Sequence, residues 1–200
     1  MFEYGEIGSS VILVVTIAIS LAGLYGSPKI IEKCLFRPYY FLRRKEYDTI
    51  YLSGFVHADF SHLLVNMITF YFFAFPLEFR VGTVPFLILY VVGLVASHGC
   101  TYFKHKDNPQ YASLGASGAI SAVLFAYIVY YPTTTLLLFF AVPVPAVLFA
   151  IGYVAYSYWA STQGRGRINH DAHLCGAISG LLFVAVTDPG AFARLPQIFG

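Results

Sequence analysis

Residues 114–131 of this 200-residue chain read LGASGAISAVLFAYIVYY, a run of 18 residues in which no side chain carries a charge. A run of about this length and apolarity is sufficient to cross the hydrocarbon core of a bilayer as an α-helix. Its first turn contains the small residues Gly115, Ser117 and Gly118, which allow a second helix to approach closely. The stretch therefore predicts a membrane-spanning helix that packs tightly against a neighbour.

Five similar apolar runs lie on either side of this one, each bounded by charged residues, proline or glycine. Together they predict an all-α fold, a polytopic membrane bundle of six transmembrane helices that forms a single domain over residues 1–200. The expected spans are about 9–25, 60–79, 84–103, 114–131, 144–160 and 173–187. The first residues are acidic and lack the basic region of a cleaved signal peptide, so we expect the first span to be retained. Pro143 and Pro145 predict an apolar loop before the fifth span.

The connection at residues 26–56 is long and mixes basic and apolar side chains, among them Arg43, Arg44, Lys45, Leu35 and Phe36. This mixture is typical of a segment that lies in the membrane interface and extends its basic ends toward the headgroups.

Composition supports a membrane location. Hydrophobic residues make up 58% of the chain and charged residues 11%, whereas soluble domains carry roughly 25% charged residues. The net charge is only +2 and the basic residues lie near span ends, so the partner expected is the lipid bilayer and not nucleic acid. Cys34, Cys100 and Cys175 are odd in number and lack CxxC spacing, so we expect small buried hydrophobic residues and neither a disulfide framework nor a zinc site. No metal or cofactor is expected. A metalloprotease would need a motif such as HExxH and an aspartyl protease two buried carboxylates, and we find neither in the sequence.

Polar residues inside spans are costly in hydrocarbon and face the bundle interior. His62 and Asn66 are four residues apart at the start of the second span, so they project from one helical face, and His57 precedes them as a possible site-lining residue. Taken singly, Asn66 is an ordinary interhelical hydrogen-bonding residue and Ser117 an ordinary packing residue.

His173 begins the sixth span, on the same helical side as Gly176 and Gly180, a GxxxG face. Because the even-numbered spans all start on one side of the membrane, Ser117 and His173 are expected to meet, with Gly115, Gly118, Gly176 and Gly180 supporting close packing. A serine becomes nucleophilic when a histidine accepts its proton. The resulting oxyanion needs donors, which His62, Asn66 and the Ser117 backbone N–H can provide.

These residues resemble the rhomboid family of intramembrane proteases. His57, His62 and Asn66 match its His-x4-His-x3-Asn pattern, residues 115–118 match its GxSG motif, and His173 with its two glycines matches its sixth span. The resemblance implies an intramembrane serine endopeptidase that cleaves single-pass transmembrane substrates with a Ser117–His173 dyad. The chain departs from the family in having Ser121 where many members have an aromatic that packs on the catalytic histidine, and Phe36-Arg37 where many have Trp-Arg.

Two other functions are compatible with a polytopic bundle. A catalytically silent adaptor would bind transmembrane helices but has no need for both Ser117 and His173. A small transporter would need buried charges or repeated halves, which we do not find in the sequence. The two aspartates near the polar spans, Asp59 and Asp171, are expected to be helix N-caps. No role is expected for His98, His105 or His170.

Membrane orientation receives two opposed predictions. The loops on the active-site face carry ten of the twelve basic residues, which favours a cytoplasmic face. The rhomboid resemblance implies an extracytoplasmic active site in a multi-pass protein of the cell membrane. We adopt the second, because six of the ten belong to the interfacial first loop.

Overall fold

The computed structural model describes residues 6–138, 141–163 and 169–193, and its main helices coincide with the predicted spans to within a few residues. In chain order these are α1 (Ile7–Leu21) with a π-helical turn (Ala22–Gly26), α5 (Phe60–Val81), α6 (Thr83–His105), α7 (Ser117–Tyr130), α8 (Ala146–Gln163) and α9 (His170–Thr187). Four segments of the described chain are long and apolar enough to cross a membrane: 7–26, α5, α6 and α9. The α7 helix is apolar but has only 14 residues.

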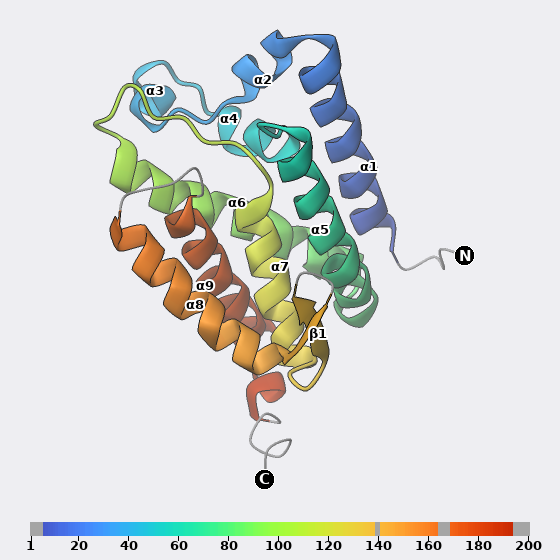
Figure 1. The fold of residues 1–200 in the computed structure, drawn as a ribbon. Coiled ribbons are helices and arrows are strands. Elements are labelled where there is room, and N and C mark those ends of the chain that lie inside the picture. Colours follow the sequence, from blue (N-terminus) through green and yellow to red (C-terminus); the bar gives the residue numbers. More distant parts are fainter. Residues whose placement is uncertain (1–5, 139–140, 164–168, 194–200) are drawn as a thin grey trace.

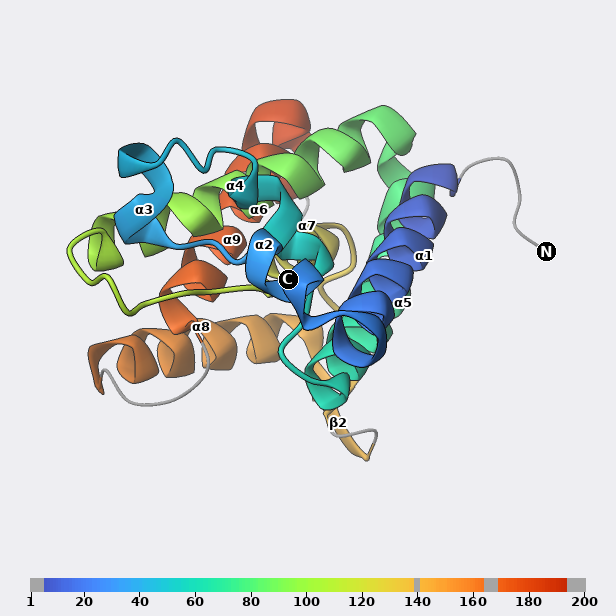
Figure 2. The same cartoon turned by 90° about the horizontal axis from the view of Figure 1, so that it is seen from above.

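The α7 helix lies at the centre of the bundle, surrounded by α5, α6, α8 and α9 (Figures 1 and 2). Every residue from Gly118 to Val129 is buried. A helix that is buried all round must be apolar all round, which is what its sequence provides. Its position allows one helix to receive side chains from several neighbours.

Small residues set the distance between α7 and its neighbours. A methyl group on Gly176 would overlap the carbonyl oxygen of Gly118, and one on Gly180 would overlap that of Ala122. A methyl on Gly93 of α6 would lie 2.5 Å from the Ala122 side chain. The α9 and α6 backbones therefore contact α7 directly, as in other small-residue helix pairs in membranes.

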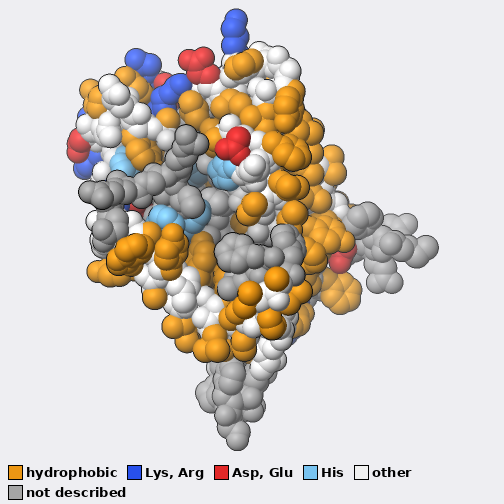
Figure 3. Space-filling view, viewed as in Figure 1, with side chains coloured by type: hydrophobic (Ala, Val, Ile, Leu, Met, Phe, Trp, Pro, Cys, Tyr) orange, Lys and Arg blue, Asp and Glu red, His pale blue; other side chains and the backbone are white. Residues whose placement is uncertain are grey.

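The first turns of α5, α7 and α9 lie at one end of the bundle, beside the helical segments of the first loop (Figure 1). These segments are α2 (Pro28–Cys34), α3 (Pro38–Arg43), α4 (Thr49–Leu52) and a 3-10 turn (Ser53–Phe55). Proline starts both α2 and α3, a position where its missing N–H costs no helical bond. Figure 3 shows Lys and Arg at this end of the molecule and histidines close by, with hydrophobic side chains over much of the rest of this face.

Phe36 anchors the first loop to the bundle. Its side chain is fully buried, its ring lies 4.6 Å from the His98 ring, and its backbone pairs with Ser113 in an isolated antiparallel bridge. The His98 ring in turn is held by Ser53 and by the Leu94 carbonyl, both at 2.8 Å. His98 is therefore a buried structural residue.

Glu78 ties α1 to the end of α5. Its carboxylate is fully buried and accepts hydrogen bonds from the Gly8 N–H (2.9 Å), the Ser9 N–H (2.6 Å) and the Thr83 hydroxyl (2.7 Å). The first N–H groups of a helix have no partner within the helix and carry partial positive charge, so a carboxylate satisfies both needs.

The apolar loop predicted before α8 is instead a short β-hairpin. Strand β1 (Thr135–Leu138) pairs antiparallel with β2 (Val142–Pro145), in a register that sets Thr135 opposite Pro145. Pairing satisfies backbone groups that an open apolar loop would leave without partners. The prolines of β2 do not prevent this, because proline is tolerated on an edge strand.

Candidate active site

Ser117 is the first residue of α7, and Gly115 makes the turn that leads into it. Gly115 has a positive φ of 106°, which a residue with a side chain rarely adopts, and its N–H donates to the Ser53 carbonyl at 2.8 Å. As a first-turn residue, Ser117 presents an N–H that has no carbonyl partner within the helix. The local fold thus places a hydroxyl and a helix N-terminal N–H at the same point.

The structure brings Ser117 and His173 together. Ser117 Oγ and His173 Nε2 are 2.7 Å apart, within hydrogen-bonding distance, although the residues are 56 positions apart in the chain. The contact depends on the glycine-mediated packing of α7 on α9, because Gly176 lies one helical turn after His173 and directly contacts Gly118.

His62 and Asn66 border the same turn from α5. A methyl group on Gly115 would lie 2.8 Å from His62 Cε1, 3.0 Å from His62 Nε2 and 3.7 Å from Asn66 Nδ2. Asn66 is buried, and its Nδ2 has no hydrogen-bond partner among the described residues. An unpaired buried donor costs roughly 1–3 kcal/mol, so its presence beside Gly115 requires an explanation.

His57 lies behind His62. It is fully buried, and its ring is 4.9 Å from the His62 ring. Its Nδ1 is 2.9 Å from Ser20 Oγ, whose only proton is donated to the Phe55 carbonyl, so Nδ1 carries the hydrogen and donates to Ser20. His57 therefore supports His62 from below the surface of the site.

Ser121 and Tyr153 occupy the side of the site that faces α8. Ser121 Oγ donates to the Ser117 carbonyl at 2.9 Å and lies 2.8 Å from Tyr153 Oη. The Tyr153 ring is stacked against the His173 ring, with centroids 6.4 Å apart and planes inclined by 23°. An aromatic from α8 thus lies against His173, although position 121 carries none.

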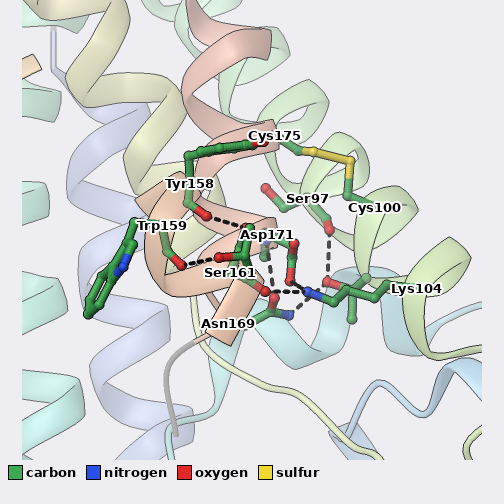
Figure 4. Close-up of polar contacts among 12 residues, drawn as sticks. Ser97, Cys100, Lys104, Tyr158, Trp159, Ser161, Asn169, Asp171 and Cys175 are labelled. Carbon is green, nitrogen blue, oxygen red and sulfur yellow. Dashed lines mark hydrogen bonds and ion pairs between the residues drawn. A yellow bond between two sulfur atoms is a disulfide. The ribbon is translucent and has the colours of Figure 1, made fainter. Parts of the chain in front are cut away.

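A brace between α6 and α9 holds the start of α9 (Figure 4). Cys100 and Cys175 form a disulfide, Lys104 forms an ion pair with Asp171, and the Asn169 amide donates to the Thr101 hydroxyl at 2.8 Å. The prediction that these two cysteines are unpaired hydrophobic residues is wrong. The spacing of the two cysteines in the sequence does not indicate a disulfide, because it is the packing of α6 against α9 that brings them together. The third cysteine, Cys34, is free and buried as predicted.

The N-cap of α9 is Asn169, not Asp171 as predicted. Asn169 Oδ1 accepts from the Ala172 N–H at 3.1 Å, while Asp171 lies in the first turn and pairs with Lys104. The other predicted cap is correct, because Asp59 accepts from the His62 N–H at 2.8 Å.

A small cavity of about 20 Å³ adjoins Ser117, and its lining includes the polar residues Ser97, Thr101 and Asn169. This is about the space that one water molecule needs. Within the described residues we find no group of three or more His, Cys, Asp or Glu side chains that could hold a metal ion.

Some residues at the site could not be found from the sequence. Tyr153 is one of many tyrosines, and its neighbours Ser121 and His173 come from two other helices. His170, for which no role was expected, has its ring 6.0 Å from the His173 ring. Both residues are recognised as part of the site only because they lie close to His173 in space, and a single sequence does not show which residues are close in space.

Known proteins with similar sequences carry the same family name. The family model described as the Rhomboid domain matches residues 44–189. The chain is 32% identical over 144 residues to RHOMBOID-like protein 12, mitochondrial, of Arabidopsis thaliana, which covers 64% of this chain and 43% of that protein. It is 31% identical over 178 residues to Rhomboid protein 1, mitochondrial, of Saccharomyces cerevisiae, a match that covers 84% of this chain and 50% of that protein. It is 33% identical over 139 residues to Presenilin-associated rhomboid-like protein A, mitochondrial, of Danio rerio, a match that covers 66% of this chain and 36% of that protein.

The matches span half or less of the length of these relatives. Their names assign them to mitochondria, so they give no support to the expected cell-membrane location. The all-α fold and the four apolar helices do establish an integral, multi-pass membrane protein. Because the family model covers well over half of the residues, the predicted resemblance is confirmed, and the chain belongs to the rhomboid family.

Proposed function

We propose that this protein is an intramembrane serine endopeptidase that hydrolyses peptide bonds in or near the transmembrane segments of single-pass membrane proteins. Ser117 is the nucleophile and His173 the general base. The observation that carries this proposal is the 2.7 Å contact between Ser117 Oγ and His173 Nε2, which joins the partly buried first turns of two closely packed helices. A serine packed only for its small size does not need an imidazole at its hydroxyl.

The steps follow from this contact. His173 Nε2 accepts the Ser117 proton as Oγ attacks the substrate carbonyl, and the carbonyl oxygen becomes an oxyanion. The C–N bond then breaks, and the leaving amine takes the proton from His173. Water, deprotonated by His173 in turn, attacks the carbonyl of the acyl-enzyme. The bond between this carbon and Ser117 Oγ then breaks, the acid product leaves, and the proton returns from His173 to Oγ. The cavity beside Ser117 supports this step, because it offers room for one water molecule.

The arrangement around Gly115 supports an oxyanion site. The His62 ring and the Asn66 amide lie against Gly115, two residues before Ser117, and Asn66 Nδ2 has no partner in the described part of the chain. With the Ser117 N–H they make up the proposed set of donors. Donors fixed in advance at the place where negative charge develops account for a large part of many enzymes' rate enhancement. An unpaired amide is therefore understandable as a donor that finds its acceptor in the transition state.

The proposed topology is six membrane crossings in one domain, with the active-site end on the extracytoplasmic side. The Cys100–Cys175 disulfide favours this orientation, because it lies in the first turns of α9 near His173 and disulfides persist in oxidising compartments. The printed names of the relatives favour a mitochondrial membrane.

Cleavage of a model single-pass substrate in liposomes tests the proposal. Wild type should release two fragments, and Ser117→Ala should abolish release while leaving thermal stability unchanged, because it removes one oxygen and little volume. Ser10→Ala, whose hydroxyl donates to the Glu6 carbonyl on α1, is the matched control and should remain fully active. Residual cleavage by Ser117→Ala at the wild-type rate would contradict the dyad. Capture of the substrate by wild type without cleavage would favour a silent adaptor.

A further inference from the structure

We propose that Tyr153 of α8 is a positioning residue that fixes the orientation of the His173 ring and makes this orientation depend on the placement of α8. The inference rests on the proposed protease function, since it assigns to His173 the role of general base. The described contacts of three helices, α7, α8 and α9, carry it.

The hydrogen bonds determine how the Tyr153 hydroxyl is used. Ser121 Oγ has one proton, which it donates to the Ser117 carbonyl. At the 2.8 Å contact between Ser121 Oγ and Tyr153 Oη, the proton must therefore come from Tyr153. Two successive hydrogen bonds, from Tyr153 to Ser121 and from Ser121 to the backbone carbonyl of Ser117, thus orient the tyrosine.

The ring of Tyr153 is fixed from several sides. The Phe125 ring of α7 lies 5.4 Å from it and the Phe149 ring of α8 lies 5.7 Å from it, while the His173 ring lies nearly parallel at 6.4 Å. Offset parallel rings at such distances attract each other beyond the effect of burial. An imidazole that lies against a fixed ring has fewer orientations available than one that faces lipid or water.

This contact crosses from α8, a helix with a large exposed apolar face. Five of its large side chains are more than half exposed: Leu148, Ile151, Tyr156, Tyr158 and Trp159. Displacement of α8 from α7 would lengthen the hydrogen bond between Tyr153 and Ser121. The same movement would withdraw the Tyr153 ring from the His173 ring. The orientation of the His173 ring therefore depends on whether α8 is packed against α7.

Steady-state cleavage by three variants tests the inference. Tyr153→Leu should lower kcat about tenfold with KM within about twofold, because the stacking partner is lost while substrate contacts remain. Tyr153→Phe keeps the ring and should recover kcat to within about threefold of wild type. Tyr158→Leu is the matched control, an exposed tyrosine on the same helix, and should be indistinguishable from wild type.

Two results would overturn the inference. One is a wild-type kcat in Tyr153→Leu. The other is a fall in kcat that parallels a fall in melting temperature and that Tyr153→Phe does not recover, which would reveal a packing role alone. Both require that wild type cleaves the substrate and that Ser117→Ala does not. If wild type itself shows no Ser117-dependent cleavage, the proposed function fails first, and the two failures are thus distinguished.

Discussion

Replacement of Asn66 by alanine separates binding from catalysis. Asn66 Nδ2 has no hydrogen-bond partner among the described residues, so its removal breaks no bond of that nitrogen in the resting protein. The oxyanion forms only in the transition state, so the loss should appear in kcat. One donor of this kind is worth up to about 10²-fold, or about 2.7 kcal/mol at 1.36 kcal/mol per tenfold. KM should stay within about twofold of wild type, because ground-state binding is unaffected.

The assay is cleavage of a fluorogenic transmembrane substrate in liposomes, with thermal unfolding measured on the same samples. Asn66→Asp keeps the volume, removes the donor and places negative charge near the oxyanion, so it should be at least as slow as Asn66→Ala. Asn108→Ala, in the exposed loop after α6, is the matched control. An unchanged kcat in Asn66→Ala, or a raised KM with kcat intact, would refute the reasoning and return Asn66 to helix packing.

Three further predictions concern the scaffold. Gly176→Ala should cost about 1–3 kcal/mol in unfolding free energy and reduce kcat by about 10²-fold, because the new methyl group displaces α9 and His173 from α7; Gly99→Ala, with open space around it, should do neither. Glu78→Gln should lower unfolding free energy by about 1.5–3 kcal/mol, since it removes the charge that caps α1, whereas the exposed Glu32→Gln should change it by less than about 0.5 kcal/mol. Burial, with a smaller effect of neighbouring His62, lowers the pKa of His57 to about 3. Because the unfolded state binds this proton at about pH 6.5 and the folded state does not, stability should fall as pH drops from about 6.5 toward 3, by about 1.4 kcal/mol per unit. Thermal unfolding at pH 7.5 and 4.5 checks this, and an equal pH dependence in His57→Gln would contradict it.

Local sequence properties predict much of the fold. Helix positions follow from the length and apolarity of each run, because a bilayer accepts few alternatives to a helix. Asp59 was identifiable as a cap for a similar reason, since a cap acts within its own first turn. The small residues at 115–118 and the Gly176–Gly180 pair indicate close packing before any coordinates are known, because only a side chain of that size permits it.

Features that depend on two distant segments were not predictable. The disulfide joins positions 75 residues apart, and the charge on Glu78 is compensated by the backbone of α1, about 70 residues earlier in the chain. The β-hairpin escaped prediction because its apolar run is too short to distinguish strand from loop by periodicity. Asn169 rather than Asp171 caps α9 because the helix begins at His170, about three residues before the predicted span, so that Asp171 lies in the first turn and pairs with Lys104 of α6.

In the candidate site, too, local sequence predicted some residues and missed those that depend on contacts between distant segments. Residue types and spacing suggested Ser117, His173, His62 and Asn66, since each is unusual inside a membrane span. The aromatic ring that lies against His173 is that of Tyr153, on a helix that the sequence alone did not connect to the site.

The central claim is that Ser117 is a nucleophile activated by His173, and covalent labelling tests it most directly. Purified protein is treated with a fluorophosphonate, and the adduct is located by peptide mass spectrometry. Wild type should carry one adduct, on Ser117, with fluoride displaced by its hydroxyl oxygen, and His173→Ala should label at least about 10²-fold more slowly. An adduct on another serine, or an equal rate in His173→Ala, would contradict the account.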